Sequence, residues 1–598
     1  MHRYWNKENA ACLLRGLLIG IIILLQWFQL EYSPIVQKTW DFTQSEMLVL
    51  MNLGLVSFLN ILLVLMVQKW EVSLGILSAA CGIWSVVGYY VTLYHGSPLC
   101  FTLLRNAGTA MNVAGSYDFA MDGHVLMLLA LSVLQAVLLV LLARIKGKPG
   151  FSWKRFGVRA GLLALNGLFL YATLFDATPI KPAKTIGWSW SAAMNTYGYT
   201  CCLAEDLGNL IQPYTKPEGY DSGLIDYRAP DEKQPEVLPD VILILNETFY
   251  DLTRYSDIQP DRDIFAPFYG LENAVIGHAV TPVTGGGTNN AEYELLTSNS
   301  MYLLNADAPF HYVDFAKENS NAVRYFNDLG YTTWGMHCAV ATNYARDRVY
   351  PQLGFDHVLL GKADFRYLNS YGNRPWLDSD NYRDLIHQYE SGGDEPRFLY
   401  LLTYQNHGGW EQNDASLDTV HVANAPEALS GQMDEYLSSV DLSVQAFLEL
   451  TDYFAAADRP VIICMVGDHG PSFVEQMEPL AEYSDEEAAI AAKATPYAIW
   501  ANFPLDISGG GDASLVDLVP MVLEQAGLPL TPYYEAILEL REQYPIRTGD
   551  GVTVDPDGKI RNYTYGGSDF ELLTRYYCME YNGLMAGDDF ISELFSVD

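Results

Sequence analysis

The chain has 598 residues, 50% of them hydrophobic, and its 35 Lys and Arg against 72 Asp and Glu give a net charge of −37. This length is too great for one small domain, and the apolar fraction excludes an intrinsically disordered chain. The first 180 residues hold 12 basic and 8 acidic side chains, whereas the remainder holds 23 and 64, a net of −41. So acidic a second part excludes nucleic acid as a partner, because the phosphate backbone requires a basic face.

Five apolar stretches in the first part predict a multi-pass α-helical membrane domain. Four of them are long enough to cross about 30 Å of hydrocarbon as helices, and the fifth is the shortest. The first stretch is not read as a signal peptide, because no small-residue cleavage site follows it and four further stretches do. The stretches are Ala11–Leu30, Met47–Val67, Val72–Tyr94, His124–Ala143 and Ala160–Phe175.

Basic residues predict the orientation of these spans. Lysines and arginines crowd the segment from Arg144 to Arg159, between the fourth and fifth stretches. By the positive-inside rule this segment is cytoplasmic, so the N-terminus is cytoplasmic as well. After five crossings everything beyond Asp176 is extracellular, at a cell membrane. If the fifth stretch does not cross, the second part is cytoplasmic instead.

The second part predicts one α/β domain. Continuous apolar runs flanked by polar residues are typical of strands buried on both faces. Helical patterns alternate with these runs, which predicts a mainly parallel central sheet with helices on both faces. The expected strands are Val241–Leu245, Thr332–Met336, Phe398–Tyr404, Val461–Val466 and Tyr497–Ala501, and the expected helices are Phe315–Leu329, Gln432–Ala455 and Ser514–Gln525.

These patterns divide the chain into four segments. A transmembrane domain covers residues 1–176, a connector rich in Pro, Gly and Tyr covers 177–239, the α/β domain covers 240–546, and an appendage covers 547–598. In the appendage, Val552–Val554 and Ile560–Tyr565 predict a hairpin around Asp555–Gly558. A terminal helix is expected near Phe570–Met579, and no chemistry is assigned to the appendage.

Polar residues follow four of the expected strands. Glu247 comes after the first strand, His337 after the second, His407 after the third, and Asp468 and His469 after the fourth. In a parallel sheet the carboxyl ends of the strands are where ligands bind. Each residue alone has an ordinary structural explanation, as a helix cap or a hydrogen-bonded loop histidine. A buried carboxylate is costly unless it is paired or metal-bound, and Asp468 with His469 has the residue types of half a metal site. The four placements together predict a functional site at this edge of the sheet.

Three consecutive glycines precede Thr288. A helical pattern begins directly afterwards, which would place Thr288 at a helix N-terminus, where free backbone N–H groups favour a phosphate. A capping threonine behind a flexible turn is the alternative interpretation. The segment lacks the Gly-Lys-Ser/Thr ending of a nucleotide-binding P-loop.

In their order and spacing these motifs resemble the lipoteichoic acid synthase family. The matching segments are Asn246-Glu-Thr, Gly286-Gly-Thr-x-x-x-Glu-x-x-x-Leu-Thr, Arg346-Asp-x-x-Tyr-x-x-Leu-Gly-Phe-Asp, Asn406-His and Gly467-Asp-His-Gly. That family has five membrane spans followed by an extracellular α/β domain of the sulfatase/alkaline-phosphatase-like type, and the resemblance extends to about Leu540. The chain has no Cys-x-Pro/Ser-x-Arg segment of a formylglycine sulfatase and no Asp-Ser-Ala of an alkaline phosphatase.

The resemblance implies a nucleophile and a cofactor. Thr288 would be the nucleophile, and Glu247, Thr288, Asp468 and His469 would hold one divalent metal ion. The family preference is Mn²⁺, with Mg²⁺ as the alternative. A hydroxyl is a poor nucleophile at neutral pH, and coordination to a metal lowers its pKa.

The resemblance also implies a head-group site. His337, Arg346 and His407 match positions that contact phosphoglycerol in the family, and either histidine could protonate the leaving alkoxide. Ala339 and Tyr344 stand where the family has an acidic residue and a tryptophan. Tyr344 is therefore included among the candidate substrate-binding residues, and the identity of the head group stays open.

The function that the resemblance implies is phosphoglycerol transfer at the membrane. Glycerophosphate would pass from phosphatidylglycerol, through a covalent intermediate on Thr288, to a glycerophosphate polymer or glycolipid acceptor of the lipoteichoic acid type. One alternative is a transferase of the same fold that moves phosphoethanolamine, or that moves glycerophosphate onto a glycan. The other is a non-catalytic membrane protein that binds an envelope polymer.

Overall fold

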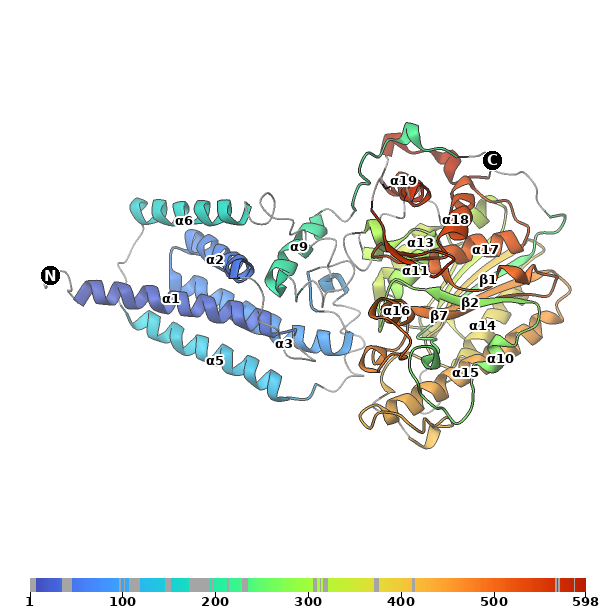
Figure 1. The fold of residues 1–598 in the computed structure, drawn as a ribbon, viewed down its shortest axis with the longest axis horizontal. Helices are drawn as coiled ribbons and strands as arrows, with labels where there is room; N and C mark the ends of the chain where they lie inside the picture. Colours follow the sequence, from blue (N-terminus) through green and yellow to red (C-terminus); the bar gives the residue numbers. More distant parts are fainter. Residues whose placement is uncertain are drawn as a thin grey trace. The chain divides into compact units, whose positions relative to one another are not determined.

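A computed structural model describes most of the chain, and Figure 1 shows it as a ribbon. The chain divides into two compact units: residues 1–104 with 117–212 form unit 1, and residues 105–116 with 213–598 form unit 2. The described residues are 7–34, 46–95, 98–101, 103–106, 119–145, 152–171, 194, 197–211, 214–227, 235–304, 309–311, 313, 315, 321–341, 343–369, 376–410, 415–564, 567, 570–585 and 587–597.

Unit 1 is helical. Each of the five apolar stretches contains a helix, and a further helix, α9 (Tyr199–Ile211), follows them. Of the described residues, the helices α1, α2, α3 and α5 are long and apolar enough to cross a bilayer, which confirms four of the five expected helices as candidate spans. The five helices are α1 (Lys7–Tyr32), α2 (Glu46–Val67), α3 (Trp70–His95), α5 (Gly123–Arg144) and α6 (Trp153–Tyr171).

The helix α6 differs from the expected fifth span. It begins at Trp153, seven residues before the apolar stretch, and so includes Lys154, Arg155 and Arg159. Its described part ends at Tyr171, and Phe175 lies outside the described residues. The fifth crossing therefore stays a prediction, and so does the extracellular location of unit 2 that depends on it.

Buried amide side chains connect the helices of unit 1. Asn60 on α2 donates a hydrogen bond to Gln26 on α1, and Gln26 in turn donates to Ser78 on α3. Gln135 on α5 donates to Gln29 on α1. In a bilayer the lipid tails are as apolar as the helix surfaces, so the hydrophobic effect does not drive helices together. Hydrogen bonds of this kind then contribute to the association of apolar helices. The apolar helices therefore form one bundle held by polar contacts.

Unit 2 is built on an eight-stranded sheet of order β4-β3-β5-β1-β6-β7-β2-β8. All neighbours from β4 to β6 pair in parallel, whereas β7 runs antiparallel to both β6 and β2. The expected mainly parallel sheet is confirmed. The strands are β1 (Asp240–Asn246), β2 (Ala274–Val280), β3 (Thr332–His337), β4 (His357–Leu360), β5 (Arg397–Leu402), β6 (Val461–Gly467), β7 (Ala494–Ala501) and β8 (Ala513–Ser514).

The strands β2, β4 and β8 were not expected from the sequence. Because β7 is antiparallel to β2 as well as to β6, β2 runs in the same direction as β1 and β6. Its carboxyl end therefore lies at the same edge of the sheet as theirs. The strand expected at Phe398–Tyr404 ends at Leu402, which leaves Thr403 and Tyr404 in the loop at that edge.

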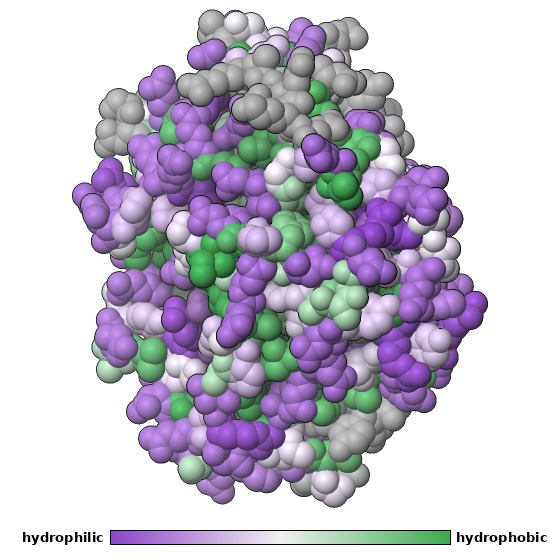
Figure 2. Space-filling view, turned by 90° about the vertical axis from the view of Figure 1, so that its right-hand side faces the viewer, coloured by the Kyte–Doolittle hydropathy of each residue, from purple (hydrophilic) through white to green (hydrophobic). Residues whose placement is uncertain are grey.

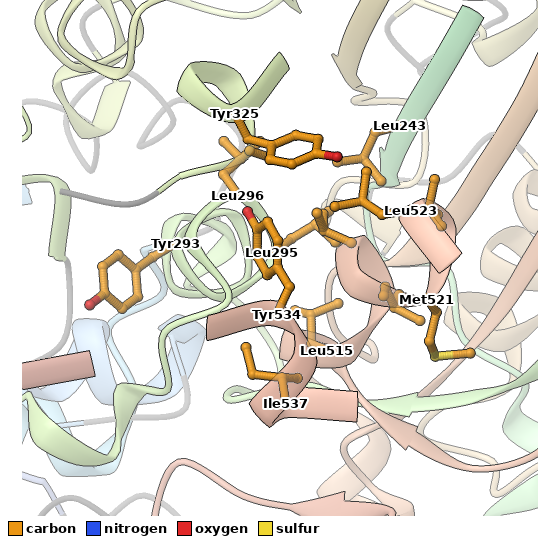
Figure 3. Close-up of a cluster of buried hydrophobic side chains, with 14 of the residues drawn as sticks. Leu243, Tyr293, Leu295, Leu296, Tyr325, Leu515, Met521, Leu523, Tyr534 and Ile537 are labelled. Carbon is orange, nitrogen blue, oxygen red and sulfur yellow. The ribbon is translucent and has the colours of Figure 1, made fainter. Parts of the chain in front are cut away.

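Helices cover both faces of the sheet, as expected. Alternate residues of β1 belong to two separate hydrophobic cores, Leu243 in one and Ile244 in the other. In Figure 1 α11, α13, α17 and α18 lie on one side of the strands, and α10, α14 and α15 on the other. Figure 3 shows part of the first core, where Leu243 clusters with residues of α11, α17 and α18. The helices are α10 (Ala266–Tyr269), α11 (Thr288–Thr297), α12 (Ala322–Asp328), α13 (Arg346–Leu353), α14 (Asp378–Ser391), α15 (Ser430–Ala455), α17 (Leu518–Gln525), α18 (Pro532–Gln543) and α19 (Glu571–Met585).

Two expected helices are shorter than the sequence suggested. Instead of Phe315–Leu329, α12 begins at Ala322, where the side chain of Asn321 caps it by accepting from the backbone N–H of Arg324. The second is the helix expected at Ser514–Gln525. Its first turn is a short 3-10 helix (Leu515–Asp517), and α17 begins only at Leu518. The expected C-terminal hairpin is confirmed as an antiparallel pair, β10 (Val552–Val554) with β11 (Ile560–Asn562).

One face of unit 2 is largely polar. The face shown in Figure 2 is largely hydrophilic, and its hydrophobic residues form small patches that polar side chains separate. This agrees with the surplus of acidic residues in the second part of the chain.

Candidate metal centre and nucleophile

The carboxyl ends of β1 and β6 bring three of the predicted residues together. The strands are paired so that Asn246 lies opposite Gly467, which places Glu247 beside Asp468. One ligand atom from each of Glu247, Asp468 and His469 lies within 4.8 Å of the others, and all three side chains are buried. The imidazole Nε2 of His469 is 3.2 Å from Oδ2 of Asp468 and 3.8 Å from Oε1 of Glu247.

The chemistry of these side chains fits a divalent cation. Oδ2 of Asp468 is buried and has no hydrogen-bond partner. Burial, and then the neighbouring Glu247 carboxylate, raise the pKa of Asp468 to about 7. The Nδ1–H of His469 donates to the carbonyl of Gly470 over 2.8 Å, which leaves the Nε2 lone pair beside the two carboxylates. Two carboxylates and one neutral imidazole are a common ligand set for Mn²⁺, Zn²⁺ and related ions.

An unusual turn holds the two carboxylates in place. Thr248 has a left-handed backbone with φ of 46°, which is uncommon for a β-branched residue. Its N–H donates to Oδ1 of Asp468 over 2.6 Å, and its hydroxyl donates to Glu247 over 2.7 Å. The hydroxyl of Tyr436 lies within 3.0 Å of the carbonyl oxygens of Thr248 and Tyr250 and so braces the turn. Nothing in the sequence indicated this role for Tyr436.

The three glycines position Thr288 next to this cluster. They follow β2, and Gly285, Gly286 and Gly287 all have positive φ. The N–H of Gly285 donates to the carbonyl of Gly470, the same oxygen that accepts from His469. A Cβ at Gly285 would lie 2.9 Å from the Cα of Ser472, so a larger residue would separate the two loops.

Thr288 is the first residue of α11 and is buried, with Gly287 as the cap. The alternative interpretation of Thr288 as a capping residue is therefore wrong. The interaction of its side chain with Asp468 acts to lower the pKa of that carboxyl. The structure thus gathers Glu247, Thr288, Asp468 and His469, while their roles as ligands and nucleophile stay predictions.

Arg346 forms a buried ion pair that was not predicted from the sequence. Its Nε and Nη2 donate to the carboxylate of Glu292 over 2.6 to 3.2 Å, and both side chains are almost fully buried. The guanidinium carbon also lies 5.1 Å from the ring centre of Tyr344. Glu292 is four residues after Thr288 on α11, so the two side chains lie on the same face of that helix. This spacing was the available signal for including Glu292.

The two predicted head-group histidines differ in their surroundings. His337 is buried, and its Nδ1–H donates to the carbonyl of Leu402. Burial, followed by the charges of Arg346 and His407, holds the pKa of His337 well below its usual range. It is therefore neutral, with Nε2 available only as an acceptor. His407 is partly exposed, and its ring stacks on Tyr404 at 4.6 Å.

Several known proteins are similar to this chain. The family model described as Sulfatase matches residues 239–528. A protein of Rhizobium meliloti (strain 1021) named for cyclic beta-1,2-glucan modification is 28% identical over 371 residues, which cover 59% of this chain and 56% of that protein. The chain therefore spans little more than half the length of this curated relative.

Two solved structures are similar. Phosphoglycerol transferase GacH of Streptococcus pyogenes, in complex with sn-glycerol-1-phosphate, has a TM-score of 0.51 and 19% identity, covering 63% of this chain and 99% of that one. Lipoteichoic acid synthase LtaP of Listeria monocytogenes has a TM-score of 0.43 and 17% identity, covering 63% and 98%. The first of these similarities shows a shared fold.

Proposed function

We propose, from the match of residues 239–528 to the family model described as Sulfatase, that this chain is a metal-dependent phosphotransferase of the cell envelope. It moves glycerophosphate from phosphatidylglycerol to an envelope polymer or glycolipid, with unit 2 on the outer side of the membrane. The observation that carries the proposal is the buried cluster of Glu247, Asp468 and His469, with the Thr288 side chain beside Asp468 at the start of α11.

The donor half-reaction begins with Thr288. Its Oγ forms a bond to the phosphorus of the lipid, and its proton passes to Asp468, with which its side chain interacts. The bond from phosphorus to the diacylglycerol oxygen breaks at the same time. A divalent cation held by Glu247, Asp468 and His469, Mn²⁺ or Mg²⁺, would supply a lower pKa for the hydroxyl and offset charge on the phosphoryl oxygens.

The leaving diacylglycerol oxygen needs a proton, and we assign its donor as His407. A neutral His337 whose Nδ1–H is already donated to Leu402 has no proton to give at Nε2. Nε2 of His337 is instead suited to accept a hydrogen bond from a glycerol hydroxyl. Arg346, with its planar set of donors, is suited to the phosphate oxygens, and Tyr344 lies against it.

In the acceptor half-reaction the roles of acid and base are reversed. A hydroxyl of the acceptor gives its proton to His407 and attacks the phosphorus bound to Thr288. The bond from phosphorus to Oγ breaks, and the proton returns to Thr288 from Asp468. The products are the phosphoglycerylated acceptor and the free enzyme.

A glycan is the second candidate acceptor. The name of the Rhizobium relative, which refers to modification of a cyclic beta-1,2-glucan, favours it. Two partly exposed aromatic rings near His407 also suit a sugar, since Trp376 and Tyr404 lie 5.3 Å apart and Tyr404 stacks on His407.

The test is lipid turnover by the purified full-length protein in detergent with Mn²⁺. We expect release of diacylglycerol from fluorescent phosphatidylglycerol by the parent and none by Thr288→Ala. Equal release by both proteins would remove Thr288 from the mechanism. Cleavage of phosphatidylethanolamine alone would replace glycerophosphate by phosphoethanolamine as the group transferred. A glucan and a glycerophosphate oligomer, supplied separately with phosphatidylglycerol, identify the acceptor by the product that carries the label.

A further inference from the structure

Glu292 lies at the junction of the nucleophile and the candidate phosphate-binding arginine. It is on α11, one helical turn after Thr288, and its side chain is fully buried. Its two oxygens accept from Nε and Nη2 of Arg346, from the hydroxyl of Tyr350 over 2.7 Å and from that of Tyr400 over 3.4 Å. So many donors fix the carboxylate in a single position.

The contact uses one side of the guanidinium only. Nε and Nη2 of Arg346 both donate to Glu292, whereas among the described residues no hydrogen bond involves Nη1. The guanidinium carbon also lies over the ring of Tyr344, 5.1 Å from the ring centre. The orientation of Arg346 is therefore set by the protein, with one nitrogen left for a ligand.

The pair also changes the charge of the site. A buried arginine with no partner would present a full positive charge to a phosphate, and in a low-dielectric interior that attraction is strong. The carboxylate of Glu292 compensates this charge at 2.6 Å. An anion beside Nη1 would therefore accept a hydrogen bond from Arg346, while the Arg346–Glu292 pair as a whole carries almost no net charge.

We propose that Glu292 is a positioning residue for the phosphoryl transfer, which holds Arg346 at a fixed distance from Thr288 and limits its affinity for anions. The inference rests on the proposed function. Thr288 and Glu292 are four residues apart on one helix, a rise of about 6 Å, so a rigid element links the attacking oxygen to the guanidinium. The compensated charge keeps the phosphate-containing product from being bound too tightly to leave.

Two variants separate position from charge. Glu292→Gln removes the negative charge and leaves one acceptor oxygen for the guanidinium. Glu292→Asp keeps the charge but shortens the side chain by one methylene, which draws Arg346 toward α11. A misplacement of about 1 Å in such a group lowers turnover by about 100-fold. Tyr350→Phe is the matched control, because it removes one hydrogen bond from the same carboxylate without altering the pair.

The readouts are kcat and KM for phosphatidylglycerol, the inhibition constant of inorganic phosphate and the unfolding temperature, all for the full-length protein with Mn²⁺. For Glu292→Gln we expect kcat to fall at least 10-fold while phosphate inhibits at least 3-fold more tightly. For Glu292→Asp we expect a similar fall in kcat with phosphate inhibition within 2-fold of the parent. Tyr350→Phe should retain kcat within about 5-fold.

A merely structural role gives a different pattern. Weaker phosphate inhibition by Glu292→Gln, in parallel with the loss of kcat, would overturn the inference, and so would an unchanged kcat in both variants. If Glu292→Gln does not fold, the comparison of Glu292→Asp with Tyr350→Phe decides by kcat alone, and equal values overturn it. If the parent shows no lipid turnover, the proposed function is contradicted instead. The charge of the pair is then tested separately by the binding of phosphate to the parent and to Glu292→Gln, measured as the rise in unfolding temperature.

Discussion

Replacing Asp468 by Asn is expected to make the metal-free protein more stable while abolishing its stabilisation by a cation. In the parent, burial and the adjacent Glu247 raise the pKa of Asp468 to about 7, from 3.8 in the unfolded chain. A shift of about three units corresponds to ~4 kcal/mol. Because the raised pKa belongs to a carboxyl group, this is a cost of folding that is complete above about pH 7.

The side chain of asparagine suits the metal-free site. Its Oδ1 can keep the hydrogen bond from the N–H of Thr248, which now spans 2.6 Å to Asp468. Its Nδ2 would stand in place of the unpartnered Oδ2, 3.2 Å from Nε2 of His469, and Nε2 is an acceptor because Nδ1 carries the proton. The substitution thus removes a charge and adds a hydrogen bond.

The pH dependence distinguishes this cause from general effects of mutation. As the pH falls below 7 the parent's Asp468 becomes protonated, so the advantage of Asp468→Asn should shrink to ~2 kcal/mol at pH 5 and vanish near pH 3.8. The assay is unfolding of the full-length protein in detergent with a chelator at pH 8 and pH 5, repeated with Mn²⁺. A cation at 100 times its Kd stabilises the parent by about 2.7 kcal/mol and should leave the variant unchanged.

Asp384→Asn is the matched control. Its two carboxylate oxygens accept from the backbone N–H groups of Arg366 and Tyr367, and it is not part of the cluster of Glu247, Asp468 and His469, so loss of one acceptor should destabilise by about 1–3 kcal/mol and leave the metal effect intact. The reasoning is refuted if Asp468→Asn is no more stable than the parent at pH 8 with a chelator. A gain of the same size at pH 5 would refute the electrostatic cause.

Three further changes test other parts of unit 2. Gly285→Ala places a Cβ 2.9 Å from Ser472 at a φ of 69°, so lipid turnover should fall at least 10-fold. The control is Gly330→Ala, which has a φ of 82° and nothing within 4 Å of the added Cβ, and which should reduce stability alone. Burial raises the pKa of Glu294 to about 8, so Glu294→Gln should remove a fall in the parent's unfolding free energy between about pH 5 and pH 8. Leu295→Ala, in the core of Figure 3, should lower that free energy by about 2–5 kcal/mol at constant pH.

The sequence predicted strands that contain a continuous apolar run and missed β2, whose apolar run is interrupted. Every residue of β1 and β6 is buried, so each reads as a continuous apolar run. In contrast, β2 contains Gly277 and His278. Gly277 is needed there because a Cβ would lie 1.8 Å from the carbonyl oxygen of Gly511, a contact made by a loop more than 200 residues away. Such a requirement is set by the fold and leaves no local pattern.

The same distinction applies to the site. Glu247, Asp468 and His469 could be selected because each directly follows a strand, and parallel strands end at one edge of the sheet. Glu292 and Tyr436 act through partners far along the chain, Arg346 and the carbonyl of Thr248, so their roles depend on tertiary contacts. Local sequence therefore identifies the site residues at the strand ends more readily than residues such as Glu292 and Tyr436, which contact other site residues through tertiary hydrogen bonds.

Under the proposed function, the charges of the site allow so acidic a domain to act on an anionic lipid. Arg346 and Glu292 together contribute no net charge, and His337 is neutral. What remains is the pair of carboxylates of Glu247 and Asp468, which one divalent cation would balance. The surplus of acidic residues lies elsewhere in unit 2, on a surface where salt screens charges beyond about 10 Å. Local compensation, rather than the net charge of the domain, therefore governs what a phosphodiester meets at Thr288.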